Sequence, residues 1–211
     1  ANRPDDLIEC ADLDGTGRDT VLTGVNAVGL ALDVAGEKIY WADYSYSDPC
    51  IRRADLDGSD AEDLVPVSDG CQLEGLVLDL TAGKLYWAER SDQQIWRANL
   101  DGSGAQRILE CWQGIGHPWG LALAGGRIYW PTGESIMSAT VDGDDVTTVI
   151  DDLADAPRSL EIDQAAGCIY WVTGDLSGAM VQRMNLDGTG LQTLVEGLYY
   201  GYGLALEYGE A

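Results

Sequence analysis

The segment Lys38-Ile39-Tyr40-Trp41-Ala42-Asp43 contains a Tyr-Trp pair that returns three more times along the chain. The later pairs stand at Tyr86-Trp87, Tyr129-Trp130 and Tyr170-Trp171, at intervals of 46, 43 and 41 residues. A nearly constant spacing of this length is typical of repeat architectures, in which each copy builds one supersecondary unit. The Tyr-Trp pairs therefore predict a chain of consecutive units of about 43 residues.

Two further markers accompany the Tyr-Trp pairs and keep the same order throughout. One is an Asp-Gly pair preceded by Leu or Val, and the other is a short apolar motif, Gly29-Leu30-Ala31-Leu32 in its first copy. Each marker occurs five times, so the chain holds one more copy of both than of the Tyr-Trp pair. The Asp-Gly pairs are Asp14-Gly15, Asp57-Gly58, Asp101-Gly102, Asp142-Gly143 and Asp187-Gly188, and the apolar motifs begin at Gly29, Gly75, Gly120, Ser159 and Gly203.

Each repeat is predicted to form four short antiparallel strands without a helix. The apolar motif alternates as a half-buried strand does, and a glycine-containing tight turn such as Ala35-Gly36 separates it from the Tyr-Trp strand. A third strand ends at the Asp-Gly turn and a fourth apolar strand follows. Four-stranded antiparallel sheets at a fixed period predict an all-β fold, a β-propeller with four strands in each blade.

The order of the markers predicts a single propeller domain, residues 1–211, with five blades, one of which is split between the ends of the chain. The split blade takes its third and fourth strands from residues 7–23 and its first strand from 202–207, and its Tyr-Trp strand is missing. Three explanations stay open: a three-stranded closing blade, a chain that stops early as part of a six-bladed ring, or a strand donated by another subunit. The whole blades are predicted at 28–66, 74–110, 119–150 and 158–196.

The charge of the chain argues against two classes of partner. Lys and Arg number 12 against 36 Asp and Glu, which gives a formal net charge of −24. Such a chain repels nucleic acids and anionic membranes. Its apolar stretches are also far shorter than the ~20 residues that a membrane-spanning helix needs. We therefore expect no nucleic-acid partner and no membrane insertion.

The repeats resemble the class B repeats of low-density-lipoprotein receptors, which form the YWTD propellers. The likeness covers nearly the whole chain and is strongest at residues 38–43, 95–102 and 117–123. The resemblance implies a secreted or extracellular protein that binds or docks other proteins without catalysis. The chain departs from the family pattern at the Thr-Asp half of the motif, where it has Ala42-Asp43, Ala88-Glu89, Pro131-Thr132 and Val172-Thr173.

The loops at one end of the predicted blades hold the candidate ligand-binding residues. Positions just before the first strands differ between repeats although the core positions recur, and exposed aromatic side chains beside charges are typical of protein or sugar recognition. The alternative is that these rings close the channel mouth or pack on neighbouring loops. The candidates are Glu74, Trp119, Arg158 and Tyr202 before first strands, with Glu89, His117 and Tyr44 in nearby loops.

The favoured function is a non-enzymatic binding or scaffolding propeller for a protein or glycan ligand. One alternative is a self-assembling structural subunit of an extracellular filament or surface layer. Another is an enzyme of the propeller lactonase or lyase type, which would need a metal or a His/Glu cluster. His117 is the only histidine and no motif specifies a reaction, so no catalytic or metal-binding residue is assigned. No cofactor is expected, although Ca²⁺ stays possible because hard cations bind clustered oxygens.

Five cysteines favour an oxidising compartment, and the odd number leaves at least one thiol unpaired within the chain. Cys50 and Cys71 are predicted on loops that flank one blade, so a disulfide between them is plausible. Cys111 is expected on the same face and could link subunits if it is free.

Overall fold

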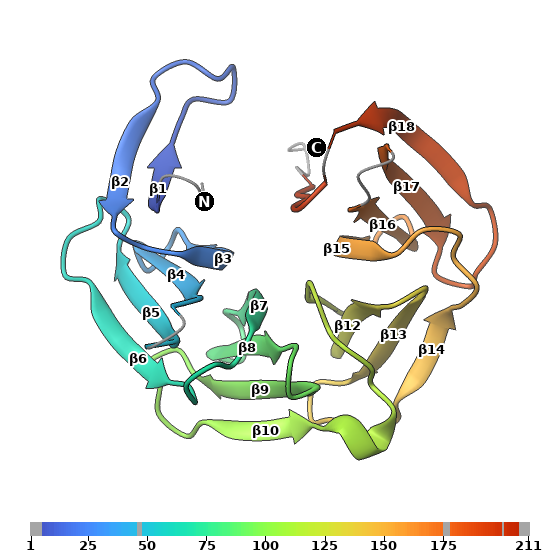
Figure 1. Ribbon diagram of the computed structural model, residues 1–211, viewed down its shortest axis with the longest axis horizontal. Helices are drawn as coiled ribbons and strands as arrows, with labels where there is room; N and C mark the ends of the chain where they lie inside the picture. The colour runs from blue at the N-terminus through green and yellow to red at the C-terminus, as the bar shows by residue number, and fades with distance from the viewer. Residues whose placement is uncertain (1–5, 46–47, 175–177, 200, 207–211) are drawn as a thin grey trace. The chain divides into compact units, whose positions relative to one another are not determined.

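The computed structural model describes residues 6–45, 48–174, 178–199 and 201–206. Short β-strands make up almost all of the regular structure, and a single 3-10 turn, η2 (Cys111–Gln113), interrupts them in this part of the chain. Figure 1 labels most of the strands. Across the described ranges, no helix has the length and apolar character that crossing a membrane requires.

The chain divides into two compact units, residues 1–107 and residues 108–211. The first unit opens with a two-stranded sheet and continues with four-stranded sheets, each formed by consecutive antiparallel strands. Its strands are β1 (Leu7–Cys10), β2 (Asp19–Thr23), β3 (Ala27–Asp33), β4 (Lys38–Asp43), β5 (Cys50–Asp55), β6 (Glu62–Pro66), β7 (Leu73–Asp79), β8 (Lys84–Glu89) and β9 (Gln94–Asn99), and the boundary between the units falls within β10 (Gln106–Leu109).

The second unit contains two more four-stranded sheets with the same order of strands. We call each of the four four-stranded sheets a blade, and the Tyr-Trp pair always lies on its second strand. The strands of the second unit are β11 (Ala122–Ala124), β12 (Arg127–Thr132), β13 (Ser135–Thr140), β14 (Thr147–Ile150), β15 (Pro157–Asp163), β16 (Cys168–Thr173), β17 (Ala179–Asn185) and β18 (Gln192–Leu198).

The predicted four-stranded antiparallel sheets are confirmed, but the described residues form four blades, and the prediction of five or six is wrong. Residues 201–206 lie in no strand, residue 207 lies outside the described residues, and among the described strands β1 pairs only with β2. A first strand gains its hydrogen bonds from a Tyr-Trp strand beside it, and the chain has only four Tyr-Trp pairs. The fifth copy of the apolar motif therefore lacks the partner that would make it a strand.

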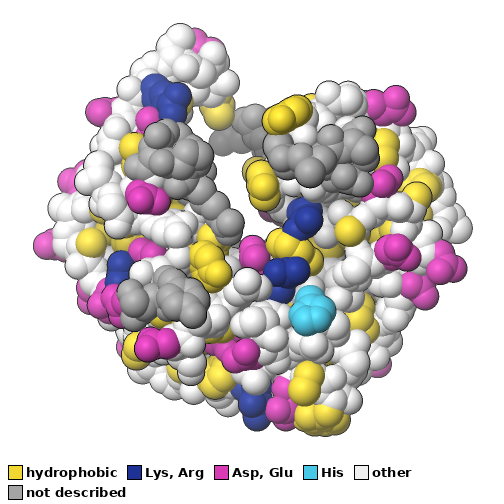
Figure 2. Space-filling model, viewed as in Figure 1, with side chains coloured by type: hydrophobic (Ala, Val, Ile, Leu, Met, Phe, Trp, Pro, Cys, Tyr) yellow, Lys and Arg dark blue, Asp and Glu magenta, His cyan; other side chains and the backbone are white. Residues whose placement is uncertain are grey.

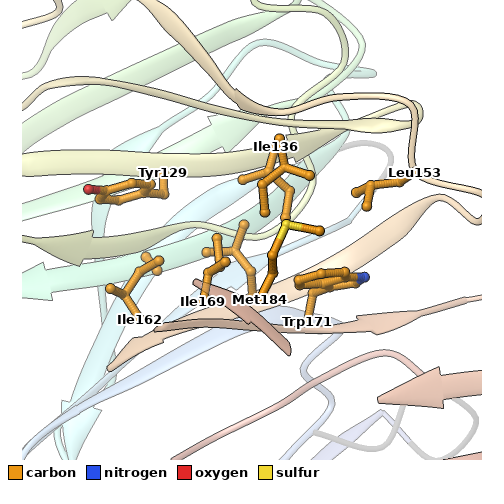
Figure 3. Packing of buried hydrophobic residues seen from close by; sticks show 10 residues of the cluster. Tyr129, Ile136, Leu153, Ile162, Ile169, Trp171 and Met184 are labelled. Atoms are coloured by element: carbon orange, nitrogen blue, oxygen red, sulfur yellow. The ribbon is translucent and has the colours of Figure 1, made fainter. Parts of the chain in front are cut away.

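The Tyr-Trp pairs form the core of the blades, because Trp41, Trp87, Trp130 and Trp171 are all at most 1% exposed. In the second unit, Tyr129 and Ile136 of one blade pack with Leu160, Ile162 and Trp171 of the next (Figure 3). A buried aromatic side chain removes roughly 150–250 Å² from water, and the first three blades each bury both rings of the pair. The repeat therefore stabilises the contact between neighbouring blades as well as the blade itself.

The glycine that opens the apolar motif allows the first strands of neighbouring blades to approach closely. In the first unit, a Cβ added to Gly29 would lie 2.5 Å from the carbonyl oxygen of Glu74 and 2.7 Å from the nitrogen of Leu76. In the second unit, the nitrogen of Gly120 donates a 2.9 Å hydrogen bond to the carbonyl oxygen of Arg158. At Gly29, only glycine leaves room for the backbone of the next blade.

The Asp-Gly turns hold their own shape through the aspartate side chain. The carboxylate of Asp57 accepts hydrogen bonds from the backbone nitrogen of Ser59 at 2.9 Å and from its hydroxyl at 2.6 Å. Asp14, Asp101 and Asp187 accept the same pair of bonds from Thr16, Ser103 and Thr189. These bonds hold the pKa of each of the four carboxyls below its ordinary value. Turn formation, the role predicted for these aspartates, is what the structure shows for these four.

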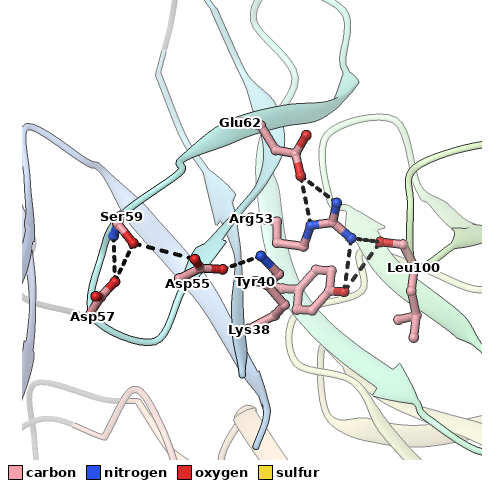
Figure 4. A network of polar contacts seen from close by, with 8 residues as sticks. All are labelled: Lys38, Tyr40, Arg53, Asp55, Asp57, Ser59, Glu62 and Leu100. Carbon is pink, nitrogen blue, oxygen red and sulfur yellow. Dashed lines mark hydrogen bonds and ion pairs between the residues drawn. The ribbon is translucent and has the colours of Figure 1, made fainter. Parts of the chain in front are cut away.

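A polar bridge joins the two blades of the first unit (Figure 4). Arg53 on β5 donates to the carbonyl oxygen of Leu100 at 3.0 Å, and the hydroxyl of Tyr40 donates to the same oxygen at 3.3 Å. Arg53 also pairs with Glu62 on β6. The tyrosine of the Tyr-Trp pair and the arginine of the third strand therefore act together at one carbonyl of the next blade.

Candidate recognition surface

The second unit presents an arginine stacked on a tryptophan. The guanidinium carbon of Arg158 lies 3.8 Å from the centre of the Trp119 ring, within the range of a cation–π contact. Arg158 is the second residue of β15, and both side chains are half-buried. Two of the residues predicted to bind a ligand are thus brought into direct contact.

The segment before β11 is fixed by hydrogen bonds on both sides of His117. The indole nitrogen of Trp130 donates to the carbonyl oxygen of Ile115 at 2.9 Å, and the nitrogen of His117 donates to the hydroxyl of Thr132 at 2.9 Å. The nitrogen of Trp119 donates to the carbonyl oxygen of Pro131 at 3.3 Å. This segment therefore holds Trp119 and the exposed His117, the single cyan side chain in Figure 2, on an ordered backbone.

Gly174, just after β16, leaves space for the arginine. A Cβ added at this glycine would lie 2.6 Å from Nε of Arg158 and 3.0 Å from its Cδ. The side chain of Arg158 therefore runs between the ring of Trp119 and the backbone of Gly174. We define His117, Trp119 and Arg158 as the recognition surface of the second unit. Tyr202, another predicted residue, is 72% exposed in the same unit.

The first unit has a polar pocket that the sequence analysis missed. Its volume is about 330 Å³, and it is lined by Asp6, Gly24, Asn26, Asp43, Tyr44, Ser45, Asp48 and Arg52. Tyr44, one of the predicted residues, is held there by backbone and side-chain bonds with Asn26 at 2.8 and 2.7 Å. Two features of the sequence could have indicated this pocket. One is Asp43, the acid that follows the first Tyr-Trp pair, and the other is the pair of arginines at 52 and 53.

Arg52 neutralises part of the acidity of this pocket. Its Nη1 lies 3.0 Å from the carboxylate of Asp43 and its Nη2 lies 2.9 Å from that of Asp48. Asp43 is only 2% exposed and accepts a further bond from the indole nitrogen of Trp41 at 3.4 Å. The pocket is therefore lined by a network of ion pairs. Asp43 in this network also holds Trp41 of the first blade in place.

Glu89 lies inside the first unit and not on its surface. Its side chain accepts a 3.1 Å hydrogen bond from the indole nitrogen of Trp87, and the residue is 6% exposed. Burial raises the pKa of this carboxyl above its ordinary value. Asp43 and Glu89 thus occupy the same position after their Tyr-Trp pairs and bind the tryptophan in the same way. Glu74, the remaining predicted residue, is half-buried on β7.

All five cysteines lie in the described part of the chain, and all are free thiols. The expected disulfide between Cys50 and Cys71 is therefore not formed in this structure, where both side chains are buried. Burial raises the pKa of Cys50, and it raises the pKa of Cys71 to about 12. Both thiols behave as small core side chains. Cys111 is exposed and lies in the turn η2.

Within the described residues, one group offers metal-ligand atoms close together. The sulfur of Cys71 and carboxylate oxygens of Glu89 and Asp92 lie within 4.8 Å of one another. The donors suit a hard cation poorly, because one is a thiol that stays protonated at neutral pH and another already accepts the indole bond of Trp87. The Ca²⁺ expectation gains no support from this cluster.

Comparisons of the sequence find receptor proteins but no matching family model. The chain is 30% identical over 186 residues to the vitellogenin receptor Yl of Drosophila melanogaster, which covers 85% of this chain and 9% of that protein. It is 31% identical over 128 residues to the low-density lipoprotein receptor-related protein 5-like protein of Homo sapiens, which covers 57% of this chain and 50% of that protein. The chain thus spans at most half the length of these curated relatives.

Comparisons of the structure identify the fold. The chain matches a protein in the crystal structure of a nidogen/laminin complex with a TM-score of 0.80 and 23% identity, over 94% of this chain and 78% of that one. It also matches a gluconolactonase from Xanthomonas campestris with a TM-score of 0.77 and 19% identity, over 96% of this chain and 73% of that one. At these identities the two matches show a shared fold and nothing about activity. Taken with the Tyr-Trp repeats and the receptor relatives, they show that the chain belongs to the YWTD family of β-propellers, the class B repeats of low-density-lipoprotein receptors.

Proposed function

We propose that this chain is a non-catalytic, extracellular protein-binding propeller that holds its ligand on the recognition surface of the second unit. The observation that carries the proposal is the position of Arg158, whose guanidinium lies over Trp119. Aromatic and arginine side chains are the residues most enriched at the centres of protein interfaces. The receptor relatives support a binding role and an extracellular setting.

The electrostatics of the second unit favour an acidic group on the ligand. Only three Lys or Arg residues follow position 108, namely Arg127, Arg158 and Arg183. Arg127 pairs with Asp145, and Arg183 donates to the side-chain oxygen of Gln192. Among the residues that the structure describes, no carboxylate pairs with Arg158. Its fork of N–H donors is therefore available to a carboxylate, the group that arginine binds most specifically.

The same geometry favours a protein over a glycan. Sugars bind tryptophan by stacking on a ring face, and the guanidinium of Arg158 already covers one face of Trp119. An acidic side chain of a peptide can bind Arg158 while a neighbouring apolar side chain contacts the ring edge. The lactonase alternative rests on fold likeness alone, so we do not propose it.

The test is a selection of phage-displayed peptides on the immobilised protein, followed by fluorescence anisotropy with the enriched peptides. We expect enriched peptides to carry Asp or Glu and to bind the Arg158→Ala variant at least about tenfold more weakly, a loss typical of a central interface residue. The matched control is Trp112→Ala, because Trp112 is a 74% exposed ring outside the recognition surface. This variant should bind within about twofold of wild type.

Two results would contradict the proposal. One is a set of enriched peptides that bind Arg158→Ala as tightly as wild type while thermal melting shows both proteins folded. The other is a glycan array in which sugars bind and peptides do not. The Arg158→Lys variant adds a check of geometry, because lysine keeps the charge but loses the planar stacking and the paired donors.

A further inference from the structure

The Asp-Gly turns have a second role, because the four turns after the first pack against the backbone of the outer strand of the preceding sheet. In the first unit, a Cβ added to Gly58 would lie well under 3.0 Å from the carbonyl oxygen of Val21, and one added to Gly102 would lie 2.6 Å from that of Leu64. In the second unit, a Cβ on Gly143 would crowd the carbonyl oxygen of Ile108 in the same way, and one on Gly188 would lie 4.0 Å from that of Val149.

The strand residue that receives the turn is the same in each case. The contacted carbonyl always belongs to the third residue of an outer strand: Val21 of β2, Leu64 of β6, Ile108 of β10 and Val149 of β14. We call this third residue and the residue after it the socket of the strand. The second residue of the socket is buried on the outer strands of the first three blades. Val65, Leu109 and Ile150 have exposed fractions of 8%, 1% and 5%.

Two surfaces in the described chain break this pattern. The third residue of β18 is Leu194, and it is 47% exposed, while the following Val195 is 44% exposed. The other surface is the first Asp-Gly turn of the chain. Leu13 before this turn is 94% exposed, and a Cβ on Gly15 would meet nothing within 4 Å. The apolar side chains at the first Asp-Gly turn and on the last outer strand are therefore both exposed.

The sequences of the two surfaces match those of seated pairs. Residues 13–17 read Leu-Asp-Gly-Thr-Gly, which is identical to residues 186–190 around the turn at Gly188. In β18, Thr193-Leu194-Val195 takes the place of Asp63-Leu64-Val65 in β6. An exposed Leu13 costs hydrophobic free energy that a matching surface would recover.

We propose that the Leu13–Gly15 turn of one copy of this chain docks on the Leu194–Val195 socket of a second copy. The contact is head-to-tail, because the turn and the socket are different surfaces, and such contacts extend to chains or rings of copies. The net charge of −24 opposes association, so docking strengthens as salt screens the repulsion between copies.

The experiment is sedimentation velocity in 0.5 M NaCl over a hundredfold range of protein concentration. Wild type is expected to shift to larger species as the concentration rises. Leu13→Asp and Leu194→Asp are expected to stay monomeric, since each places a charge on one of the two contact surfaces. Both side chains are exposed, and thermal melting checks that both variants fold.

Mixing the two variants is the decisive step. Leu13→Asp keeps an intact socket and Leu194→Asp keeps an intact turn, so the equimolar mixture should form dimers and nothing larger. Three results overturn the proposal: wild type that stays monomeric at every concentration, association that both variants retain, or a mixture of folded variants that forms no dimer. A monomer in which hydrogen exchange protects both surfaces would show that they are covered within one copy, which also overturns it.

Discussion

Gly58 satisfies two independent requirements at once. Its φ is +85°, a conformation that strains every residue with a Cβ, and its Cα faces the carbonyl oxygen of Val21 on the neighbouring strand. The Asp-Gly pattern reveals the first requirement, because such turns favour glycine at positive φ. The second depends on a strand more than thirty residues away, so the local sequence cannot show it.

The two requirements can be separated by mutation. Gly58→Ala should lower the free energy of unfolding by about 2–4 kcal/mol, because backbone strain of about 1–2 kcal/mol is joined by a clash with Val21. Gly83→Ala is the matched control, since Gly83 also has positive φ and a Cβ there meets nothing within 4 Å. It should show the strain alone. Urea unfolding measures both, and equal losses in the two variants would refute the socket contact.

Glu89 shows how a residue with the chemistry of a binding site can serve the core instead. The sequence places an acid in a loop beside aromatic residues, which is a reasonable ligand contact. The structure buries that acid, because the side chain accepts the indole N–H of Trp87 and fixes the ring. Exposure is a property of the packed sheet, so the loop sequence alone could not decide between the two roles.

The raised pKa of Glu89 predicts a pH-dependent gain for Glu89→Gln. At pH 7 the carboxyl of Glu89 is charged in the unfolded chain, whereas burial disfavours its charged form in the folded chain. This difference lowers the free energy of unfolding of the wild type, and a neutral amide at the same position removes the loss. The amide oxygen can still accept the bond from Trp87. The variant should therefore unfold at higher urea than wild type at pH 7. The difference should shrink as the pH falls through the folded pKa and vanish below the unfolded one, and a gain that grows toward acid would contradict this.

At the scale of the element, the bridge to the carbonyl of Leu100 joins parts that the sequence shows only as separate repeats. Tyr40 belongs to the second strand of one blade and Arg53 to its third, and Leu100 follows the third strand of the next. The periodicity predicted that these positions recur, and it predicted the four antiparallel strands around them. Which repeated polar residues meet each other depends on how two sheets stack, which no spacing within one repeat specifies.

The bridge predicts a measurable cost for losing one hydroxyl. Tyr40→Phe should lower the free energy of unfolding by about 0.5–1.5 kcal/mol, the usual value of a neutral hydrogen bond. Tyr170→Phe is the matched control in the last blade, where the hydroxyl accepts a 3.4 Å bond from Arg183 and, among the described residues, donates to no backbone carbonyl. It should cost less. Chemical unfolding of both variants tests this, and a larger loss for Tyr170→Phe would reverse the interpretation.

At the scale of the whole molecule, repeat markers overestimate the number of blades. Five Asp-Gly turns and five apolar motifs predicted five blades, whereas in the described part of the chain only the four repeats with a Tyr-Trp strand form four-stranded sheets. A blade needs its second strand, because the first strand otherwise has no hydrogen-bonding partner. The Tyr-Trp count was thus the reliable one. The recognition surface was partly predictable, since variable residues before first strands gave Trp119 and Arg158, but their stacking was not.

The charge of the whole chain leads to a prediction about salt. A net charge of −24 destabilises the compact state by self-repulsion, and raising the salt from about 0.01 to 1 M shortens the screening length from roughly 30 to 3 Å. The midpoint of thermal unfolding at pH 7 should therefore rise by several degrees. Exposed ion pairs such as Arg127–Asp145 weaken in salt, but each contributes at most about 1 kcal/mol.

A control near the isoelectric point, about 4.1, separates this effect from other actions of salt. There the net charge is small, so repulsion has little left to screen and the midpoint should respond weakly to the same change. If the midpoint at pH 7 falls with added salt, local ion pairs outweigh the net charge. If it rises equally at both pH values, salt acts by strengthening apolar burial, and the acidic surface is not what limits the stability of the chain.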